Sequence, residues 1–326
     1  MRPMRLATTR PGLLRHKSDS VAKEDVSSQL ILRVAVIGLP NCGKSTLVNQ
    51  LMGQKLFAVS PKVHTTQQMT LGGFVEDNRQ VVLLDTPGVV NYQYGRRLKL
   101  SRAMMTDAHY SCMESDVVMT VVDASNQRTR EIAEPQIIRT LKQNDHIPSI
   151  LVLNKVDKVK HKTYLLQLAD ILTGREKQHS TRATHWDQFS DVYMLSALTG
   201  DGVDNLKQHL LAHCQPGEWM LDADQFTDTP TKKLVEDTIR EKLFIHLHQE
   251  LPYIIKQENV YWEEYADGSL SIYQNLICTK DCQKRILIGK EGKVIKTVAT
   301  EAITDLEKAF GRTVRLFLYV MSRKPS

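Results

Sequence analysis

The sequence lacks the features of a membrane-embedded or disulfide-stapled protein. No apolar run in its 326 residues approaches the roughly 18 consecutive residues of a membrane-spanning helix. Only five cysteines are present, an odd and scattered set that indicates free thiols in a reducing compartment. Cys278 and Cys282 lie close together, but no nearby histidine or second cysteine pair completes a zinc site. The composition, with 41% hydrophobic and 25% charged residues, is that of an ordinary globular chain of about two domains.

Acidic residues are missing from the first 18 positions of the chain. The basic residues of this stretch are Arg2, Arg5, Arg10, Arg15 and Lys17. An arginine-rich leader without acids is typical of a mitochondrial transit peptide, so residues 1–28 predict import into the mitochondrial matrix. Pro3 and Pro11 make the leader a poor helix. A basic tail in the cytoplasm, or one that touches RNA, therefore stays open as an alternative.

A glycine-rich loop at residues 38–45 fits the phosphate-loop pattern G-x-x-x-x-G-K-[ST] at every fixed position. It follows a predicted buried strand over residues 31–37 and precedes a predicted helix over residues 45–52. The helix N-terminus favours an anion, Lys44 can reach the β- and γ-phosphates, and Ser45 can ligate Mg²⁺. The predicted phosphate-contacting residues are Gly38, Leu39, Pro40, Asn41, Cys42, Gly43, Lys44, Ser45 and Thr46.

Three further motifs follow predicted strands and indicate which nucleotide binds. The first is Asp85, Thr86, Pro87 and Gly88, with Val89 next; the second is Asn154, Lys155, Val156 and Asp157; the third is Ser196, Ala197 and Leu198. Asp85 would hold Mg²⁺ through water. The Asp157 carboxylate can accept two hydrogen bonds from guanine, whereas adenine offers no such pair of donors. Lys155 would lie over the base, and the backbone of the third motif would contact its O6 atom.

The alternation of strands and helices over residues 29–215 predicts an α/β domain. Apolar runs separated by helices, such as residues 116–123, are typical of a mostly parallel sheet that is covered on both faces. Ligand loops then lie at the carboxyl ends of the strands, where all four motifs fall. A polar stretch that begins at Gly174 exceeds the usual length of a connection, so we interpret residues 174–189 as a surface insertion.

Together these motifs resemble the Ras-like P-loop GTPases. Asn41 beside the Gly-Lys-Ser run, and residues 60–66 in the position of the first switch, narrow the resemblance to the Era family. The resemblance covers about residues 30–322. It implies a protein that binds GTP and GDP with Mg²⁺ and hydrolyses GTP.

The resemblance also indicates how hydrolysis would proceed. Many GTPases place a glutamine just after D-x-x-G to orient the attacking water, but Val89 occupies that position and Gln93 is displaced. Hydrolysis should therefore be slow and assisted. Relatives in this subgroup use the phosphate-loop asparagine, here Asn41, to hold a potassium ion that acts like an arginine finger.

Residues Asn41, Lys44 and Thr66 are thus the expected catalytic set, and Ser45, Thr66 and Asp85 the expected Mg²⁺ ligands. Thr65 is the alternative to Thr66. Gln67 departs from the arginine that usually follows the two threonines. The sequence does not indicate the consequence of that change.

A second domain is expected over residues 216–326, after a boundary at Pro216 and Gly217. The pattern predicts a helix over residues 231–249, strands near 254–264 and 270–279, two helices around a G-x-x-G loop, and a strand over 314–320. This β-β-α-α-β order resembles a smaller α+β KH domain of type II, whose glycine loop clamps single-stranded RNA. The predicted RNA-contacting residues are Lys284, Arg285, Gly289, Lys290, Glu291, Gly292 and Lys293.

The charge pattern agrees with this prediction. Residues 280–296 hold six basic side chains against two acidic ones, as a phosphate-contacting surface requires. The resemblance to Era implies a ligand in the small-subunit ribosomal RNA near its 3′ end, the ribosomal small subunit as a partner, and a role in its assembly. Peripheral contact with a membrane surface is a further expectation. An RNA chaperone that binds GTP with negligible hydrolysis, and a cytosolic protein of bacterial type, stay open as alternatives.

Overall fold

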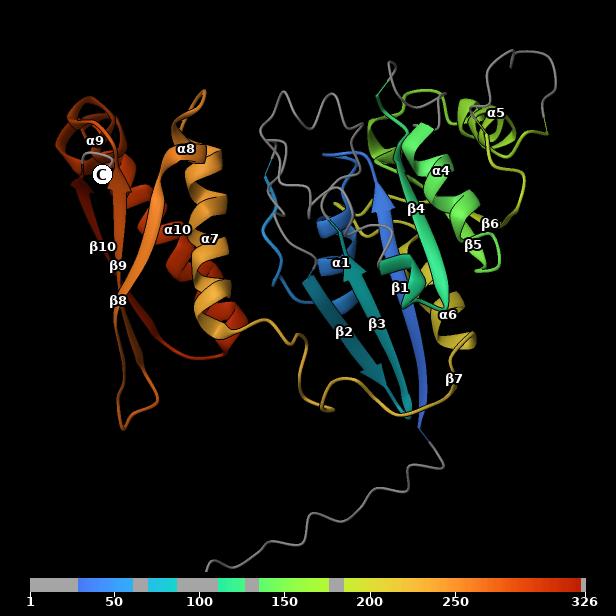
Figure 1. Cartoon of the computed structure of the whole chain (residues 1–326), viewed down its shortest axis with the longest axis horizontal. Helices are drawn as coiled ribbons and strands as arrows, with labels where there is room; N and C mark the ends of the chain where they lie inside the picture. Colours follow the sequence, from blue (N-terminus) through green and yellow to red (C-terminus); the bar gives the residue numbers. More distant parts are fainter. Residues whose placement is uncertain (1–28, 61–69, 87–110, 127–134, 176–184, 324–326) are drawn as a thin grey trace, which may run out of the picture.

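The computed structural model describes residues 29–60, 70–86, 111–126, 135–175 and 185–323, which form two domains (Figure 1). The predicted α/β domain with a mostly parallel sheet and the smaller α+β domain are both confirmed. None of the helices in these ranges is both long enough and apolar enough to span a bilayer.

The larger sheet has the strand order β2-β3-β1-β4-β5-β6. Its strands are β1 (Leu30–Gly38), β2 (Thr70–Glu76), β3 (Arg79–Asp85), β4 (Val117–Asp123), β5 (Ser149–Asn154) and β6 (Phe189–Met194). All run parallel except β2, which forms an antiparallel pair with β3. The carboxyl ends of the parallel strands therefore meet at one edge, and the predicted nucleotide motifs follow four of them.

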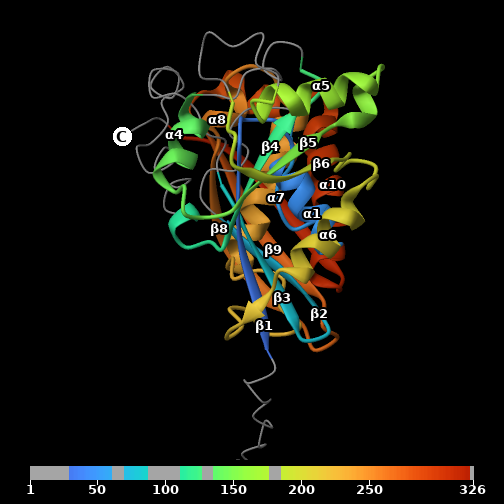
Figure 2. The ribbon, with the colours of Figure 1, turned by 90° about the vertical axis from the view of Figure 1, so that its right-hand side faces the viewer.

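Helices cover both faces of this sheet. They are α1 (Lys44–Met52), α4 (Pro135–Gln143), α5 (Thr163–Leu172) and α6 (Val203–Ala212), with a short 3₁₀ turn η2 (Val156–Lys158) after β5. In β1, Val34 and Val36 pack in one core cluster with α1 and α6, whereas Ala35 and Ile37 pack in another with α4. Figure 2 shows α4 on one side of β1 and β4, and α1 and α6 on the other. Strands buried on both faces explain the continuous apolar runs in the sequence.

The chain segment after α6 stays with the larger sheet. Strand β7 (Gln215–Pro216) pairs with β1, and the Trp219 ring N–H donates to the Leu30 carbonyl at 3.0 Å. The buried side chain of Gln80 accepts the Leu221 N–H and donates to the Leu221 carbonyl. The backbone of β2 binds residues 226 and 227 in turn. These contacts favour a domain boundary near residues 228–230, some way after the predicted one at residue 216.

The smaller domain packs its helices on one face of a sheet with the order β10-β9-β8. Its elements are α7 (Thr231–His246), α8 (Leu251–Ile254), β8 (Lys256–Glu264), β9 (Leu270–Cys278), α9 (Asp281–Ile288), the 3₁₀ turn η3 (Lys290–Gly292), α10 (Lys293–Phe310) and β10 (Val314–Ser322). Strand β9 runs parallel to β10 and antiparallel to β8. The predicted β-β-α-α-β order is thus confirmed.

The start of this domain differs in detail from the prediction. Helix α7 ends at His246 instead of residue 249, because Leu247 adopts an extended conformation. Residues 251–254 form a helical turn of their own, with a proline in its first turn, where proline is well tolerated. Strand β8 consequently begins at Lys256, two residues after the predicted start.

Candidate nucleotide site and RNA-binding loop

The phosphate loop joins β1 to α1 and has a backbone that only glycine can follow at two positions. Gly43 lies in the left-handed region with φ 98°, and a Cβ atom there would come within 2.4 Å of the Asn154 side-chain nitrogen. A Cβ atom on Gly38 would lie 2.4 Å from the Val121 carbonyl oxygen. Among the described residues, no side-chain hydrogen bond caps the N-terminus of α1. The loop therefore offers backbone N–H groups and the positive end of a helix dipole to an anion.

The predicted Mg²⁺ ligands Ser45 and Asp85 meet beside this loop. The Ser45 hydroxyl donates to Asp85 Oδ2 at 2.6 Å, and Asp85 is fully buried. Two oxygen groups this close together, next to a phosphate site, suit Mg²⁺, which prefers oxygen ligands shared with substrate phosphates. The Lys44 ammonium lies 3.2 Å from the carbonyl oxygens of Gly38 and Leu39, folded over the loop that it is expected to serve.

Asn154 organises the base side of the site. Its buried side chain donates to the Cys42 carbonyl at 2.9 Å and accepts the N–H groups of Lys155 at 2.7 Å and Ala197 at 3.0 Å. One amide thus ties the phosphate loop, the Asn-Lys-Val-Asp motif and the Ser-Ala-Leu motif together. Asp157 lies exposed in η2, on the loop that Asn154 holds.

Lys155 forms a second link between the motifs. It has a left-handed backbone with φ 63°, and its ammonium donates to the Asn41 carbonyl and to Asp123 Oδ2, the latter at 2.7 Å. Asp123 ends β4 and had no place among the residues predicted from sequence. Its position at a strand end, level with the other motifs, was the one available signal.

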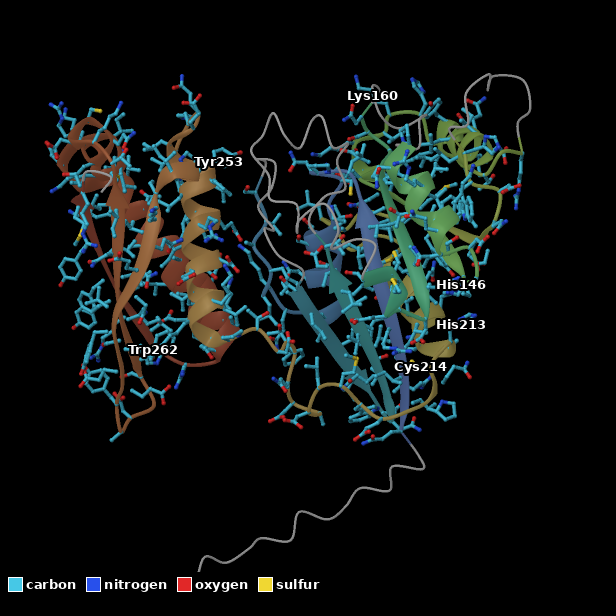
Figure 3. All side chains as sticks on the ribbon, in the orientation of Figure 1. His146, Lys160, His213, Cys214, Tyr253 and Trp262 are labelled. Carbon is cyan, nitrogen blue, oxygen red and sulfur yellow. The ribbon has the colours of Figure 1, made fainter. Side chains whose placement is uncertain are left out.

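The remaining predicted residues differ in how the structure places them. Thr46 lies in the first turn of α1, and Thr86 is buried with its hydroxyl bonded to the Val36 carbonyl at 2.8 Å. Leu198 is exposed beside the buried Ser196 and Ala197. Thr66, Pro87, Gly88 and Val89 lie outside the described residues. Figure 3 shows Lys160, just after η2, at the carboxyl edge of the sheet, and Cys214 at the opposite edge.

Replacing Asn154 with alanine should lower both stability and nucleotide affinity. The change removes three hydrogen bonds at a buried position, so we expect a loss of about 1–3 kcal/mol in the free energy of unfolding. GTP affinity should fall by at least about tenfold, since three loops lose their common anchor. Denaturant titration and GTP titration measure the two effects. Asn205→Ala, at an exposed position on α6, is the matched control. Parental stability and affinity in the Asn154 variant would contradict this role.

The glycine loop of the smaller domain joins α9 to α10. Gly289 and Gly292 have φ values of 73° and 75°, and Glu291 between them also has a left-handed backbone. A Cβ atom on Gly289 would lie 2.5 Å from Val294 Cγ2, so that position has no room for a side chain. Gly292 directly precedes α10, and within the part of the chain that the structure describes no side-chain hydrogen bond caps that helix N-terminus.

The charged side chains around this loop are accessible to a ligand. Lys290, Glu291, Lys293 and Arg285 are exposed, and Lys284 is half-buried. Ile286 is 58% exposed, whereas its neighbour Leu287 is buried in the core. An exposed isoleucine beside basic residues and an open helix N-terminus suits a phosphate backbone with unstacked bases.

Comparisons with known proteins find matches to both domains. Residues 33–155 match the family described as 50S ribosome-binding GTPase, and residues 250–325 match the KH domain family. The mitochondrial GTPase Era of Danio rerio is 35% identical over 337 residues, covering 90% of this chain and 75% of that protein. GTPase Era of Sinorhizobium medicae is 38% identical over 291 residues, covering 89% and 88%. The chain belongs to the Era family of GTPases.

Two solved Era structures resemble the fold across both domains. Era in complex with MgGDPNP and nucleotides 1506–1542 of 16S ribosomal RNA matches with a TM-score of 0.75 and 30% identity, covering 91% of this chain and 94% of that one. A variant of Aquifex aeolicus Era bound to GDP and AlF4⁻ matches with a TM-score of 0.76 and 29% identity, covering 91% and 95%. This Era GTPase hydrolyses GTP to GDP and phosphate, as its sequence motifs predicted.

The predicted insertion is anchored at its return to the Era core. The backbone N–H of Trp186 donates to the Leu172 carbonyl at the end of α5, and its ring N–H donates to Ser149 Oγ at 3.0 Å. Trp186 is buried against β5, so the chain re-enters the domain there. The central residues, 176–184, lie outside the described part of the chain.

Proposed function

We propose that this Era GTPase is a GTP-driven switch that binds small-subunit ribosomal RNA near its 3′ end during assembly of the small ribosomal subunit. One observation carries the proposal: a single chain joins a nucleotide site organised by Asn154 to a glycine loop with exposed Lys290 and Lys293. The matching Era complex with 16S ribosomal RNA supports this RNA as the ligand class.

The residues of the nucleotide site divide the work of hydrolysis. Lys44 would bind the β- and γ-phosphates, and Asp157 would select guanine. Ser45, Asp85 and Thr66 would hold Mg²⁺, which when bound neutralises charge on the phosphates. The other nucleotide-contacting residues proposed from sequence position the substrate through the backbone. GTP would thereby favour one docking of the KH domain, and GDP another.

Potassium should accelerate hydrolysis through Asn41. This residue is exposed, has a left-handed backbone with φ 61°, and lies beside Lys155 at the mouth of the phosphate loop. Its amide oxygen is a neutral ligand of the kind that suits a monovalent cation. We expect hydrolysis about tenfold faster in potassium than in sodium at equal ionic strength, a difference of about 1.4 kcal/mol in the barrier.

The measurement is a phosphate-release assay on the parent and on Asn41→Ala. The variant should lose the difference between the two salts while it still binds GTP. Equal rates of the parent in potassium and sodium would remove the potassium hypothesis.

The proposed site of action is the mitochondrial matrix, with residues 1–28 as the import leader. The mitochondrial Era proteins of Danio rerio and Salmo salar, 35% and 33% identical, support the mitochondrial form. Imaging in cells and sequencing of the mature N-terminus distinguish this location from the cytoplasm. Fractionation of the same cells tests the expected association with the small ribosomal subunit and with membrane surfaces.

Crosslinking in cells, followed by sequencing of the bound RNA, tests the proposed ligand directly. Reads concentrated at the 3′ end of the small-subunit ribosomal RNA are the expected outcome. Reads spread evenly over unrelated RNAs would count against it.

A further inference from the structure

Four charged side chains from the two domains meet between the loop after α1 and the helices α7 and α10. The Lys55 ammonium lies 2.7 Å from Glu241 Oε1 and 2.7 Å from Asp305 Oδ2. The Lys242 ammonium lies 2.9 Å from the same Glu241 oxygen and also contacts Asp305. Figure 1 shows α7 as the part of the smaller domain that faces the GTPase domain. Lys55, Glu241, Lys242 and Asp305 are called the interdomain charge cluster below.

The three members on α7 and α10 are largely removed from water, whereas the Lys55 side chain is 39% exposed. The Glu241 and Lys242 side chains are 3% and 6% exposed, and that of Asp305 is 15% exposed. Burial alone would lower the pKa of Lys242, but its hydrogen bonds to Asp305 and Glu241 outweigh that effect and raise the pKa. Burial likewise opposes ionisation of Asp305, but the bonds from Lys242 and Lys55 outweigh it and lower its pKa. Both shifts favour the charged forms of Lys242 and Asp305 inside the cluster.

A fifth contact connects the cluster to the backbone of the GTPase domain. The second oxygen of Glu241, Oε2, accepts the backbone N–H of Val59 at 2.8 Å. Val59 immediately precedes Ser60, where the predicted first switch begins. On the other side of the same loop, Asn49 of α1 accepts the N–H groups of Leu56 and Phe57. The loop is thus held by its own domain at residues 56–57 and by the KH domain at residue 59.

The energetics make the two interdomain contacts of Glu241 interdependent. Glu241 uses one carboxylate oxygen for the Lys55 ammonium and the other for the Val59 N–H, so both contacts depend on the position of a single side chain. Movement of α7 away from the loop would break both at once. The position of the smaller domain is therefore coupled to the conformation of the chain that enters the first switch.

We propose that Glu241, a residue of the KH-bearing domain, is a positioning residue for GTP hydrolysis. It holds the chain at Val59, so that the rate of hydrolysis depends on the seating of the smaller domain against the GTPase domain. This inference requires only the GTPase activity. A further step, in which RNA binding changes the hydrolysis rate through Glu241, rests in addition on the proposed function.

Two variants of the whole chain each remove the hydrogen bond between Glu241 and Val59, one by changing the acceptor and one by changing the donor. In Glu241→Gln the side-chain amide can accept from Val59 or from the lysines, but its NH2 group then faces the other donor. Val59→Pro removes the N–H donor itself and leaves the charge cluster intact. Val59→Ala keeps the N–H and is the control for the proline. Asp237→Asn is the control for the glutamine, since Asp237 forms ion pairs with Lys233 and Arg240 within α7.

The readouts are the single-turnover hydrolysis rate, GTP affinity by titration, and the thermal midpoint of each protein. We expect Glu241→Gln and Val59→Pro each to lower the hydrolysis rate at least fivefold, with GTP affinity within twofold of the parent. Both control variants should keep the parental rate. A purely structural role for Glu241 would instead shift the thermal midpoint and leave the rate of the folded protein unchanged.

A hydrolysis rate within twofold of the parent in either folded variant overturns the proposal. If Glu241→Gln does not fold, the hydrolysis rates of Val59→Pro and Val59→Ala are compared instead, and an equal rate overturns the proposal. Addition of the 3′-end RNA to the parent addresses the proposed function separately. Loss of rate in the variants with no response of the parent to RNA would support Glu241 and count against the RNA switch.

Discussion

Asp157→Asn is expected to weaken GTP binding by about 100-fold and to admit xanthosine triphosphate, because a site built for hydrogen bonding rejects a mismatched base strongly. Asp157 lies exposed in η2, on a loop that Asn154 holds against the phosphate loop, so its carboxylate can reach a base without rearrangement of the core. Guanine presents two donors, and the carboxylate accepts both. The amide of asparagine would place one of its own donors against a donor of guanine. The same amide complements xanthine, which has a carbonyl acceptor where guanine has its amine.

Titration of the parent and the variant with GTP and with xanthosine triphosphate measures this exchange. Asp145→Asn, which neutralises an exposed carboxylate after α4, is the matched control and should bind GTP like the parent. If Asp157→Asn binds GTP as tightly as the parent does, another residue selects guanine.

The double variant Gly289→Asp with Gly292→Asp should lose single-stranded RNA binding by at least about 100-fold and should keep GTP binding. Two carboxylates repel the phosphate backbone, and each adds a side chain where that backbone must approach closely. The nucleotide site is built entirely from the other domain, so its affinity should not change.

The structure shows why a single variant is needed beside the double one. A side chain on Gly289 would collide with Val294, so the double variant also tests the fold. Among the described residues, a Cβ atom on Gly292 would come within 4 Å of Lys296 alone, at 3.8 Å. The main cost of a side chain there is the left-handed backbone of the residue. Gly292→Asp alone should therefore fold and still weaken RNA binding.

Gly268→Asp provides the matched control for this experiment. Gly268 lies in the turn between β8 and β9, has φ 80°, and has open space around its Cβ position. The variant carries the same backbone cost and the same new charge at a site away from the loop. The circular dichroism spectra of the parent, Gly292→Asp and Gly268→Asp should match. A folded Gly292→Asp that binds RNA with parental affinity would mean that the glycine loop is not the RNA clamp.

Local patterns were sufficient to predict the strands and loops that carry the nucleotide-binding motifs. Strands buried on both faces must be apolar, and a phosphate loop needs glycine, lysine and a hydroxyl at set intervals. Each of these requirements acts within a few neighbouring residues. The same holds for the α9–loop–α10 unit, where glycine is needed at residues 289 and 292 for a left-handed backbone.

Local sequence patterns could not predict polar contacts between segments that are far apart in the chain. Asp123 was missed because its importance arises from Lys155, 32 positions later, whose ammonium reaches it across the strand ends. Asn154 was predicted as a nucleotide-binding residue, but its buried bonds to Cys42 and Ala197 appear only when three loops converge. The proline and glycine at 216–217 predicted a domain boundary there, but the hydrogen bonds that residues 219, 221 and 227 form with the larger sheet could not be read from the sequence.

The amino-acid sequence by itself determined the family, the two kinds of domain, the glycine-rich loop between β1 and α1 and the glycine loop between α9 and α10. Each of these follows from residue types at fixed short spacing, and short-range sterics and hydrogen bonding act the same way in any context. Only the tertiary structure decided that Glu241 lies against Lys55 and Val59, which are 186 and 182 positions away in the chain. Ion pairs between distant segments leave no periodic pattern in the sequence, because any two opposite charges suffice once the folded domains bring them together.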